Sequence, residues 1–312
     1  MPANTRLLPA YARLILCLAI PALIAATPAT ARTHAAPEAC ALASAVRADD
    51  PVRVPFRTID GRIYVDAMVN GGGPYVFALD TGASGMGRAD ASLVSALGLA
   101  PFGKGQASDG IRQAEVDLVK VRSLKFGKLE RHDLELITRD YRSRLSPEAA
   151  FAGILGRAFF ADGLLTIDYP NSTVSFTRSR TLRRDMRGAL PYENAFRIPV
   201  SVQGITTLGN LDTGANVALA LPKALYERIS AEPIKDTATA TYTNSKIETG
   251  RATIRGPVRI GNVASSNVPV RVSDKFSEVL VGAHFLQNRV VLIDQRTQSV
   301  AICPATVRRR RG

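Results

Sequence analysis

The sequence predicts an all-β protein with few short helices, built from two related halves. Several segments alternate between apolar and polar residues, as half-buried strands do, and turn residues separate them; Arg62–Val69 and Tyr75–Leu79 are examples. The tripeptide Asp-Thr-Gly occurs twice, at 80–82 and at 212–214, each time directly after such a strand. A repeat of this length indicates a duplicated domain, because solenoid units have much shorter periods.

A second match between the halves lies near the end of each half. The segment 153–159 corresponds to 279–285 at a shift of 126 residues, and the same shift relates Ile167-Asp168 to Ile293-Asp294. The two Asp-Thr-Gly copies are 132 residues apart, so an insertion of about six residues lies within the repeat. The sequence therefore predicts two lobes related by a pseudo-two-fold axis, each with its own core.

The chain divides into six expected segments. The stretch between the halves is rich in Arg and lacks apolar periodicity, which favours a linker. The expected boundaries are a signal peptide at 1–31, a flexible extension at 32–50, a first lobe at 51–177, a basic linker at 178–194, a second lobe at 195–303 and a basic tail at 304–312.

The N-terminus has the features of a secretory signal peptide. Arg6 and Arg13 accompany an apolar run at 14–26 that is short for a membrane span, and Ala29-Thr30-Ala31 is a small-residue cleavage pattern. An uncleaved anchor is the alternative. With cleavage, the sequence predicts a periplasmic or secreted protein without stable membrane insertion.

The chain carries a net charge of +13, and removal of 1–31 would leave +11. A basic balance can indicate nucleic acid or an anionic surface as partner. The positive residues are spread out, apart from 178–187 and 308–311, and no RNA- or DNA-binding motif accompanies them. We interpret the charge as a scattered basic surface and expect no nucleic-acid partner.

Cys40 and Cys303 remain if Cys17 is removed with the signal peptide. In an oxidising compartment this pair is expected to form a disulfide that closes nearly the whole chain. Two free thiols are the alternative. The bond would require the two ends of the mature chain to meet in space.

With these motifs the chain resembles the pepsin/retropepsin-type aspartic proteases, from about Val52 to Ile302. It is similar to bacterial secreted proteins that carry two retropepsin-like repeats in one chain. In that family each lobe threads its catalytic turn past an apolar-apolar-Gly strand in a ψ-shaped arrangement. The matching strands here are Ile154-Leu155-Gly156 and Leu280-Val281-Gly282. The resemblance implies two β-barrel lobes with the active-site cleft between them.

The resemblance also implies an aspartic endopeptidase whose catalytic residues are Asp80 and Asp212. Two carboxylates held close together share one proton, and the pair can activate a water molecule. This chemistry acts on a peptide or protein substrate and needs no cofactor, no metal and no covalent intermediate. Because one chain supplies both carboxylates, a monomer is expected.

The neighbours of the two carboxylates have roles implied by the same resemblance. They are Thr81 and Thr213, which would cross-bond beneath the dyad; Gly82 and Gly214, which would allow close backbone approach and support the carboxylates; Ser84, which would bond the outer oxygen of Asp80; and Asn216, which stands where a second Ser or Thr is common.

A hairpin closes over the substrate in this family. In the first half it is expected around 102–114, a stretch with three Gly and no Tyr, and in the second half Tyr242 lies on a candidate counterpart. The sequence leaves open whether one or two hairpins close the cleft.

Other function classes fit less well. Ser84 does not lie in a nucleophile elbow, because Met86 occupies the position of the last Gly. The three His are dispersed, and no clustered His or Cys predicts a metal site. A non-catalytic double-lobe module that binds a peptide or another periplasmic protein is the remaining alternative. Retention of both Asp-Thr-Gly copies favours catalysis over binding alone.

Overall fold

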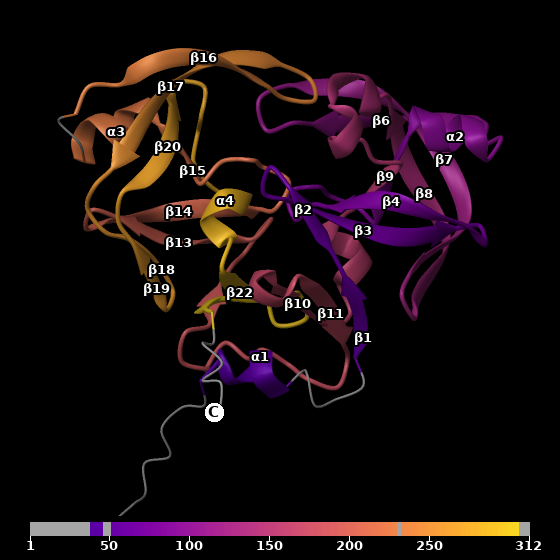
Figure 1. Ribbon diagram of the computed structural model, residues 1–312, viewed down its shortest axis with the longest axis horizontal. Helices are drawn as coiled ribbons and strands as arrows, with labels where there is room; N and C mark the ends of the chain where they lie inside the picture. Colours follow the sequence, from indigo (N-terminus) through magenta and orange to yellow (C-terminus); the bar gives the residue numbers. More distant parts are fainter. Residues whose placement is uncertain (1–37, 46–50, 230–231, 306–312) are drawn as a thin grey trace, which may run out of the picture. The chain divides into compact units, whose positions relative to one another are not determined.

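The computed structural model describes residues 38–45, 51–229 and 232–305, all of them within one compact unit. The predicted signal peptide at 1–31 lies outside these residues, as do much of the predicted extension and the end of the tail. Strands dominate the described residues and form a separate sheet in each half (Figure 1). The predicted mostly-β, two-lobed fold is confirmed.

The first lobe is built on one sheet, which has eight strands in the described part of the chain, in the order β2-β3-β4-β9-β5-β8-β7-β6. These strands are β2 (Arg57–Ile59), β3 (Arg62–Val69), β4 (Gly72–Leu79), β5 (Gly87–Asp90), β6 (Pro101–Ser108), β7 (Gln113–Phe126), β8 (Leu129–Arg139) and β9 (Gly153–Leu155). The alternation predicts the buried face correctly: Val65 and Ala67 of β3 face the core, whereas Asp66 between them is exposed.

The second lobe repeats this plan with nine strands among the described residues, in the order β16-β17-β20-β15-β21-β14-β13-β18-β19. They are β13 (Arg197–Val202), β14 (Ile205–Asp212), β15 (Leu219–Pro222), β16 (Lys235–Thr241), β17 (Lys246–Ile254), β18 (Val258–Ile260), β19 (Val263–Ser265), β20 (Val268–Ser273) and β21 (Val279–Gly282).

A third sheet combines strands from both repeats, in the order β1-β11-β10-β22-β23-β12. Its strands are β1 (Val52–Pro55), β10 (Leu164–Asp168), β11 (Thr173–Thr177), β12 (Leu190–Pro191), β22 (Arg289–Asp294) and β23 (Ser299–Pro304). Every residue of β10 is buried, and Ile167 lies opposite Val291 of β22 in antiparallel register. The two repeats therefore share a buried sheet that neither could complete alone.

The stretch predicted as a linker, 178–194, is fixed to this shared sheet. Its β12 pairs with β23, and Leu182 is fully buried. The backbone N–H of Leu182 donates to Asp294 Oδ2 at 3.1 Å, and the Arg296 guanidinium donates to the same carboxylate and to backbone carbonyls of the stretch. Its path is thus set by hydrogen bonds rather than by apolar periodicity.

Helices are few and short. The described residues contain α1 (Ala41–Ala45), α2 (Ala91–Ala96), α3 (Lys223–Ile229) and α4 (Ala283–Leu286), with 3₁₀ turns η1 (Arg142–Arg144), η2 (Pro147–Ala149), η3 (Arg157–Phe160) and η4 (Tyr169–Asn171). Asp90 caps α2 by accepting a hydrogen bond from the N–H of Ser92. None of the helices described is long and apolar enough to cross a bilayer.

Each lobe places a short strand between the strand before its Asp-Thr-Gly turn and the strand after it. In the first lobe β9 runs parallel to β4 and antiparallel to β5, with Leu155 level with Leu79 and opposite Gly87. In the second lobe β21 has the same relation to β14 and β15, with Val281 level with Leu211. This arrangement holds both ends of each turn against one strand.

A disulfide joins Cys40, next to α1, to Cys303 in β23, with the two Cα atoms 5.6 Å apart. The two ends of the described chain therefore meet, as the expected pairing requires. Cys303 is buried beside Ala39 and Leu42 in a small apolar cluster, so the bond also seats the segment 38–45 on the shared sheet.

We predict that the Cys40→Ser, Cys303→Ser double variant will lower the free energy of unfolding by about 2–5 kcal/mol, because the bond closes a loop of 263 residues. Chemical denaturation with and without a reducing agent measures the effect. The reductant should shift the midpoint of the wild type and leave that of the double variant unchanged. Equal midpoints for both proteins under oxidising conditions would contradict the prediction.

Candidate functional site

The two Asp-Thr-Gly turns lie against each other at the junction of the lobes. β4 ends at Leu79 and delivers Asp80, and β14 ends at Asp212 itself. The next residue of each turn, Thr81 or Thr213, is buried, with at most 1% of its surface exposed. Both aspartates keep some exposed surface. The turns therefore bury their threonines and leave the two aspartate residues partly exposed.

Reciprocal hydrogen bonds between the threonines join the two turns. The N–H of Thr81 donates to Thr213 Oγ1 at 3.0 Å, and the N–H of Thr213 donates to Thr81 Oγ1 at 3.0 Å. Each hydroxyl also donates across the junction, Thr81 to Leu211 O at 3.0 Å and Thr213 to Leu79 O at 2.9 Å. All four bonds are buried, so they fix the two turns relative to one another.

Backbone N–H groups of each turn hold its own carboxylate. Asp80 Oδ1 accepts hydrogen bonds from the N–H groups of Gly82 at 2.8 Å and Ala83 at 3.0 Å. Asp212 Oδ1 accepts from the N–H of Gly214 at 2.8 Å. These donors fix the orientation of both carboxyl groups.

Each carboxyl group also lies against the glycine of the other turn. A Cβ atom at Gly82 would come within 2.6 Å of Asp212 Oδ2, and one at Gly214 within 2.6 Å of Asp80 Oδ2. Any side chain at these two positions would collide with the opposite carboxylate. Glycine is therefore required here by close approach across the junction.

The two carboxyl groups form a hydrogen-bonded pair. Burial is the largest cause that raises the pKa of the Asp212 carboxyl group well above the usual range. The charge of Asp80 and the hydrogen bond with it raise the pKa further, against the N–H groups of Gly214 and Ala215, which lower it. The arrangement favours a pair that keeps one proton, because ionising both groups side by side is costly.

Two of the side chains expected to support the dyad have other surroundings. Ser84 is exposed, and Asn216 donates its amide to Asp60 Oδ2. Asp60 lies in the β2–β3 turn, where it also pairs with His284. Asn216 thus ties the second turn to the first lobe.

The two apolar-apolar-Gly segments lie directly behind the turns. Leu155 accepts a hydrogen bond from the N–H of Asp80 at 3.1 Å. The N–H of Gly156 donates to Met86 O at 3.1 Å, and that of Gly282 to Ala218 O at 3.0 Å. Leu155 and Val281 are fully buried in the main core, while Ile154 and Leu280 occupy the other face of their sheets.

Two arginines that sequence reasoning missed support the backs of the turns. Arg62 Nε donates to Gly214 O at 2.7 Å, and Arg157 Nη1 lies 3.4 Å from Gly82 O. The carbonyl group that faces each arginine belongs to the same peptide unit as the N–H of Ala83 or Ala215. That N–H donates to the carboxylate of its own turn, so one peptide unit lies between each guanidinium and the nearest catalytic carboxylate. The sequence marks Arg157 by a difference between the two repeats. Arg157 directly follows Gly156, whereas the equivalent position after Gly282 is occupied by Ala283.

Two hairpins, one from each lobe, meet at their tips. The hairpin β16–β17 reaches from the second lobe to the hairpin β6–β7 (Figure 1). Asp109 Oδ2 accepts hydrogen bonds from Asn244 N at 2.6 Å and Ser245 Oγ at 2.9 Å, and Asn244 Nδ2 donates to Ala107 O and Arg112 O. The two hairpins are thus hydrogen-bonded to each other at their tips.

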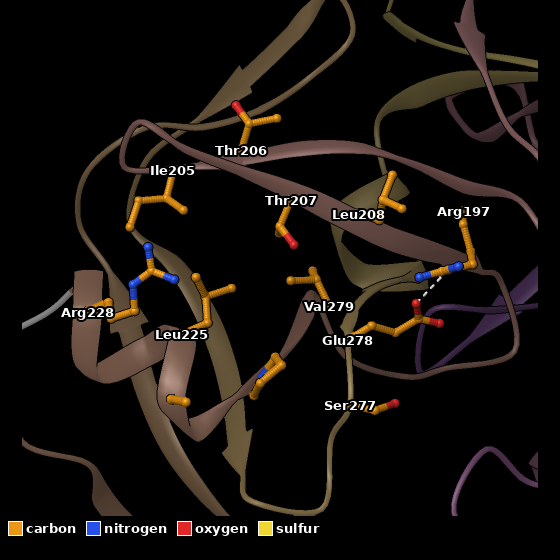
Figure 2. Close-up of a pocket in the computed structure, with 12 residues that line it drawn as sticks. Arg197, Ile205, Thr206, Thr207, Leu208, Leu225, Arg228, Ser277, Glu278 and Val279 are labelled. Carbon is orange, nitrogen blue, oxygen red and sulfur yellow. Dashed lines mark hydrogen bonds and ion pairs between the residues drawn. The ribbon is translucent and has the colours of Figure 1, made fainter.

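A hollow of about 400 Å³ in the second lobe is a separate feature (Figure 2). Apolar side chains such as Leu208, Leu225 and Val279 line it, and the ion pair of Arg197 with Glu278 lies at one end. No residue of either Asp-Thr-Gly turn lines this hollow. Within the described ranges, no three His, Cys, Asp or Glu side chains are grouped to hold a metal ion.

We predict that Thr213→Val will lower the free energy of unfolding by about 2–4 kcal/mol. The change removes two buried hydrogen bonds and leaves the N–H of Thr81 and the carbonyl of Leu79 without partners. Thr213→Ser retains the hydroxyl and is the control, with an expected loss of about 1 kcal/mol for the missing methyl group. Chemical denaturation measures the free energy of unfolding of both variants. If Thr213→Val and Thr213→Ser lower it equally, the hydroxyl group does not stabilise the junction.

We also predict a pH-dependent stabilisation by Asp212→Asn. The pKa of Asp212 in the folded protein is raised above its value of about 3.9 in the unfolded chain. Its protonated form therefore adds stability that is complete below about pH 4 and is lost as the pH rises through the raised pKa. The asparagine variant does not lose stability in this way. Above the raised pKa, its free energy of unfolding should therefore increase relative to that of the wild type by about 1.4 kcal/mol for each unit by which the pKa is raised.

Thermal or chemical unfolding between pH 3 and pH 9 tests this dependence, with Asp66→Asn, a change at an exposed position of β3, as the control. A constant difference between Asp212→Asn and wild type across that range would contradict a raised pKa.

Comparison with protein families agrees with the geometry. The family model described as "Aspartyl protease" matches residues 65–159, and the model described as "gag-polyprotein putative aspartyl protease" matches residues 198–288. Each match contains one Asp-Thr-Gly turn and the apolar-apolar-Gly strand behind it. A search of curated protein sequences finds no match. The chain therefore belongs to the aspartyl proteases and carries two retropepsin-like repeats in one polypeptide.

Proposed function

We propose that this protein is an aspartic endopeptidase whose catalytic groups are Asp80 and Asp212. The observation that carries the proposal is the pairing of the two carboxyl groups at the junction, with the pKa of Asp212 raised by burial and by Asp80. Such a pair contains one acid and one base at the same pH. Both aspartates keep exposed surface through which a substrate can reach them.

The proposed reaction uses these two groups in opposite roles. Asp80 takes a proton from a water molecule, whose oxygen attacks the carbonyl carbon of the scissile peptide bond. Asp212 gives its proton to the carbonyl oxygen, and a tetrahedral diol forms. The diol collapses as Asp80 returns its proton to the leaving nitrogen and Asp212 recovers one from a diol hydroxyl. The C–N bond breaks, both aspartates regain their starting states, and no covalent intermediate or metal ion takes part.

The surroundings of the dyad support this assignment. The threonine cross-bonds and the backbone donors fix both carboxyl groups before substrate arrives, which lowers the cost of reaching the reactive geometry. The two tip-bonded hairpins are the elements that we propose to cover a bound peptide. Because one chain supplies both turns, a monomer is sufficient for activity.

The proposal extends to localisation. The disulfide between Cys40 and Cys303 is of the kind that forms and persists outside the cytoplasm, which supports a periplasmic or secreted enzyme. The role assigned to residues 1–31 as a signal peptide follows from their sequence and lies outside the described residues.

We predict that Asp80→Asn and Asp212→Asn will each reduce kcat/KM for peptide cleavage by about 10²- to 10⁴-fold or more, because each removes one partner of the acid–base pair. Cleavage of a mixed peptide library by the full chain, followed by mass spectrometry, measures this. Asp66→Asn and Asp236→Asn replace exposed carboxylates of the first and second lobe and should retain wild-type rates.

Cleavage by either dyad variant at the wild-type rate would refute the assignment. Binding of peptides without cleavage by the wild type would instead support the alternative, a non-catalytic module on the same two-lobed fold.

A further inference from the structure

In each lobe one face of the sheet is continuous with the dyad. Side chains two positions apart on a strand share a face, so Ala78 marks the face of Asp80 and Asn210 that of Asp212. We call these the dyad faces. The opposite faces carry the main core, including Leu79 and Leu211.

The strand register places arginines on both dyad faces. In the first lobe Ala78 of β4 is level with Ile154 of β9, which lies opposite Arg88 of β5. Two residues further along β5, Asp90 is level with Arg139 of β8. In the second lobe Asn210 of β14 is level with Leu280 of β21, which lies opposite Ala220 of β15. Ala220 is in turn level with Arg271 of β20. Each lobe thus carries arginine a few strands from its catalytic turn.

These arginines have buried nitrogen atoms without hydrogen-bond partners in the described part of the chain. The atoms are Arg88 Nε, Arg139 Nη2 and Arg271 Nη1. Arg88 is only 8% exposed. Leaving a charged donor buried and unsatisfied is costly, so proteins rarely retain such groups without a use for them. Three such atoms on the two dyad faces indicate that an acceptor is supplied from outside.

Several arginines lie close to one another at these positions. Burial lowers the pKa of Arg139, and the charges of Arg88 and Arg144 lower it further, whereas Tyr141 and Asp109 oppose this change. Burial and Arg251 lower the pKa of Arg271, and Tyr242 opposes them. Asp90 and Asp109 are near, but backbone N–H and hydroxyl groups already occupy their oxygens. Neither carboxylate therefore bonds the three unpaired nitrogen atoms.

Arg139 and the nearby Arg144 contact the tip of the β16–β17 hairpin. Arg139 Nη1 donates to Asn244 Oδ1 at the tip of β16–β17, and Arg144 donates to Thr243 O at 2.9 Å. Tyr242 begins that tip; burial raises its pKa to about 12, Asp109 and Asp212 raise it too, and Arg271 opposes them. The Tyr242 hydroxyl thus lies within electrostatic reach of both the dyad and Arg271.

We propose that the peptide substrate carries Asp or Glu side chains on both sides of the scissile bond, received by Arg88 and Arg139 on the first lobe and by Arg271 on the second. A carboxylate can accept two parallel hydrogen bonds from one guanidinium, so it can satisfy the unpaired nitrogen atoms. This inference rests on the proposed peptidase function and adds the substrate class to it.

Binding to the full chain carrying Asp80→Asn tests the proposal without requiring turnover. The probes are two fluorescent peptide mixtures of equal length, one rich in Asp and Glu and the other with Asn and Gln at the same positions. We expect the acidic mixture to bind about 10- to 100-fold more tightly. Arg271→Gln and Arg88→Gln should each reduce that preference. Arg259→Gln and Arg122→Gln, at exposed positions of β18 and β7, should leave it unchanged.

Arg271→Glu provides a check that does not depend on the buried Arg88 site, because Arg271 is partly exposed. It should shift the preference toward mixtures that contain Lys. Equal binding of the acidic and amide mixtures, binding of neither, or a preference that survives both arginine changes would overturn the proposal.

Cleavage of the same mixtures by the wild type separates the two claims. Selective binding of the acidic mixture without cleavage would refute the proposed peptidase function but support the proposed preference for an acidic ligand. Cleavage of both mixtures at equal rates would retain the peptidase and remove the acidic specificity.

Discussion

The reciprocal bonding of Thr81 and Thr213 is the interaction on which the rest of the site depends. Each turn alone is a carboxylate held by its own backbone N–H groups. The four buried hydrogen bonds between the turns hold the two carboxyl groups next to each other. The close approach of Gly82 and Gly214 to the opposite carboxylates, and the raised pKa of Asp212, are consequences of that junction.

The junction is symmetric in its bonds but not in its surroundings. The two arginines behind the turns, Arg62 and Arg157, both come from the first repeat, and they lie at different distances from the carbonyl groups that they face. A duplicated chain can thus give its two aspartates different roles, which an exact two-fold dimer cannot do without substrate. The raised pKa of Asp212, caused by burial and by the charge of Asp80, supports the assignment of Asp212 as the acid.

Much of this architecture could be predicted from the sequence, because its signals are local. The two Asp-Thr-Gly turns and the apolar-apolar-Gly strands repeat in order, and alternation marks the buried faces of β3 and β13. The shared six-stranded sheet could not be predicted, because pairing of β10 with β22 joins segments more than 120 residues apart without a local mark. The same holds for the contact of Asp109 with Asn244 and for Arg62, whose partner Gly214 lies 152 residues away. Asn216 shows a further limit: its position in the motif suggested a bond to the dyad, whereas its amide reaches Asp60.

The central claim is that Asp80 and Asp212 form one unit that keeps a proton where an isolated aspartate would have lost it. A ¹³C NMR titration of the side-chain carboxyl carbons, assigned with the two Asn variants, measures this directly. We predict that the carboxyl carbon of Asp212 shows a proton that is retained well above pH 4. When Asp212 loses this proton, the carboxyl signal of Asp80 should shift as well, because the two groups interact. Independent titration of both carboxyl groups near pH 4, with neither signal responding to the other, would contradict it.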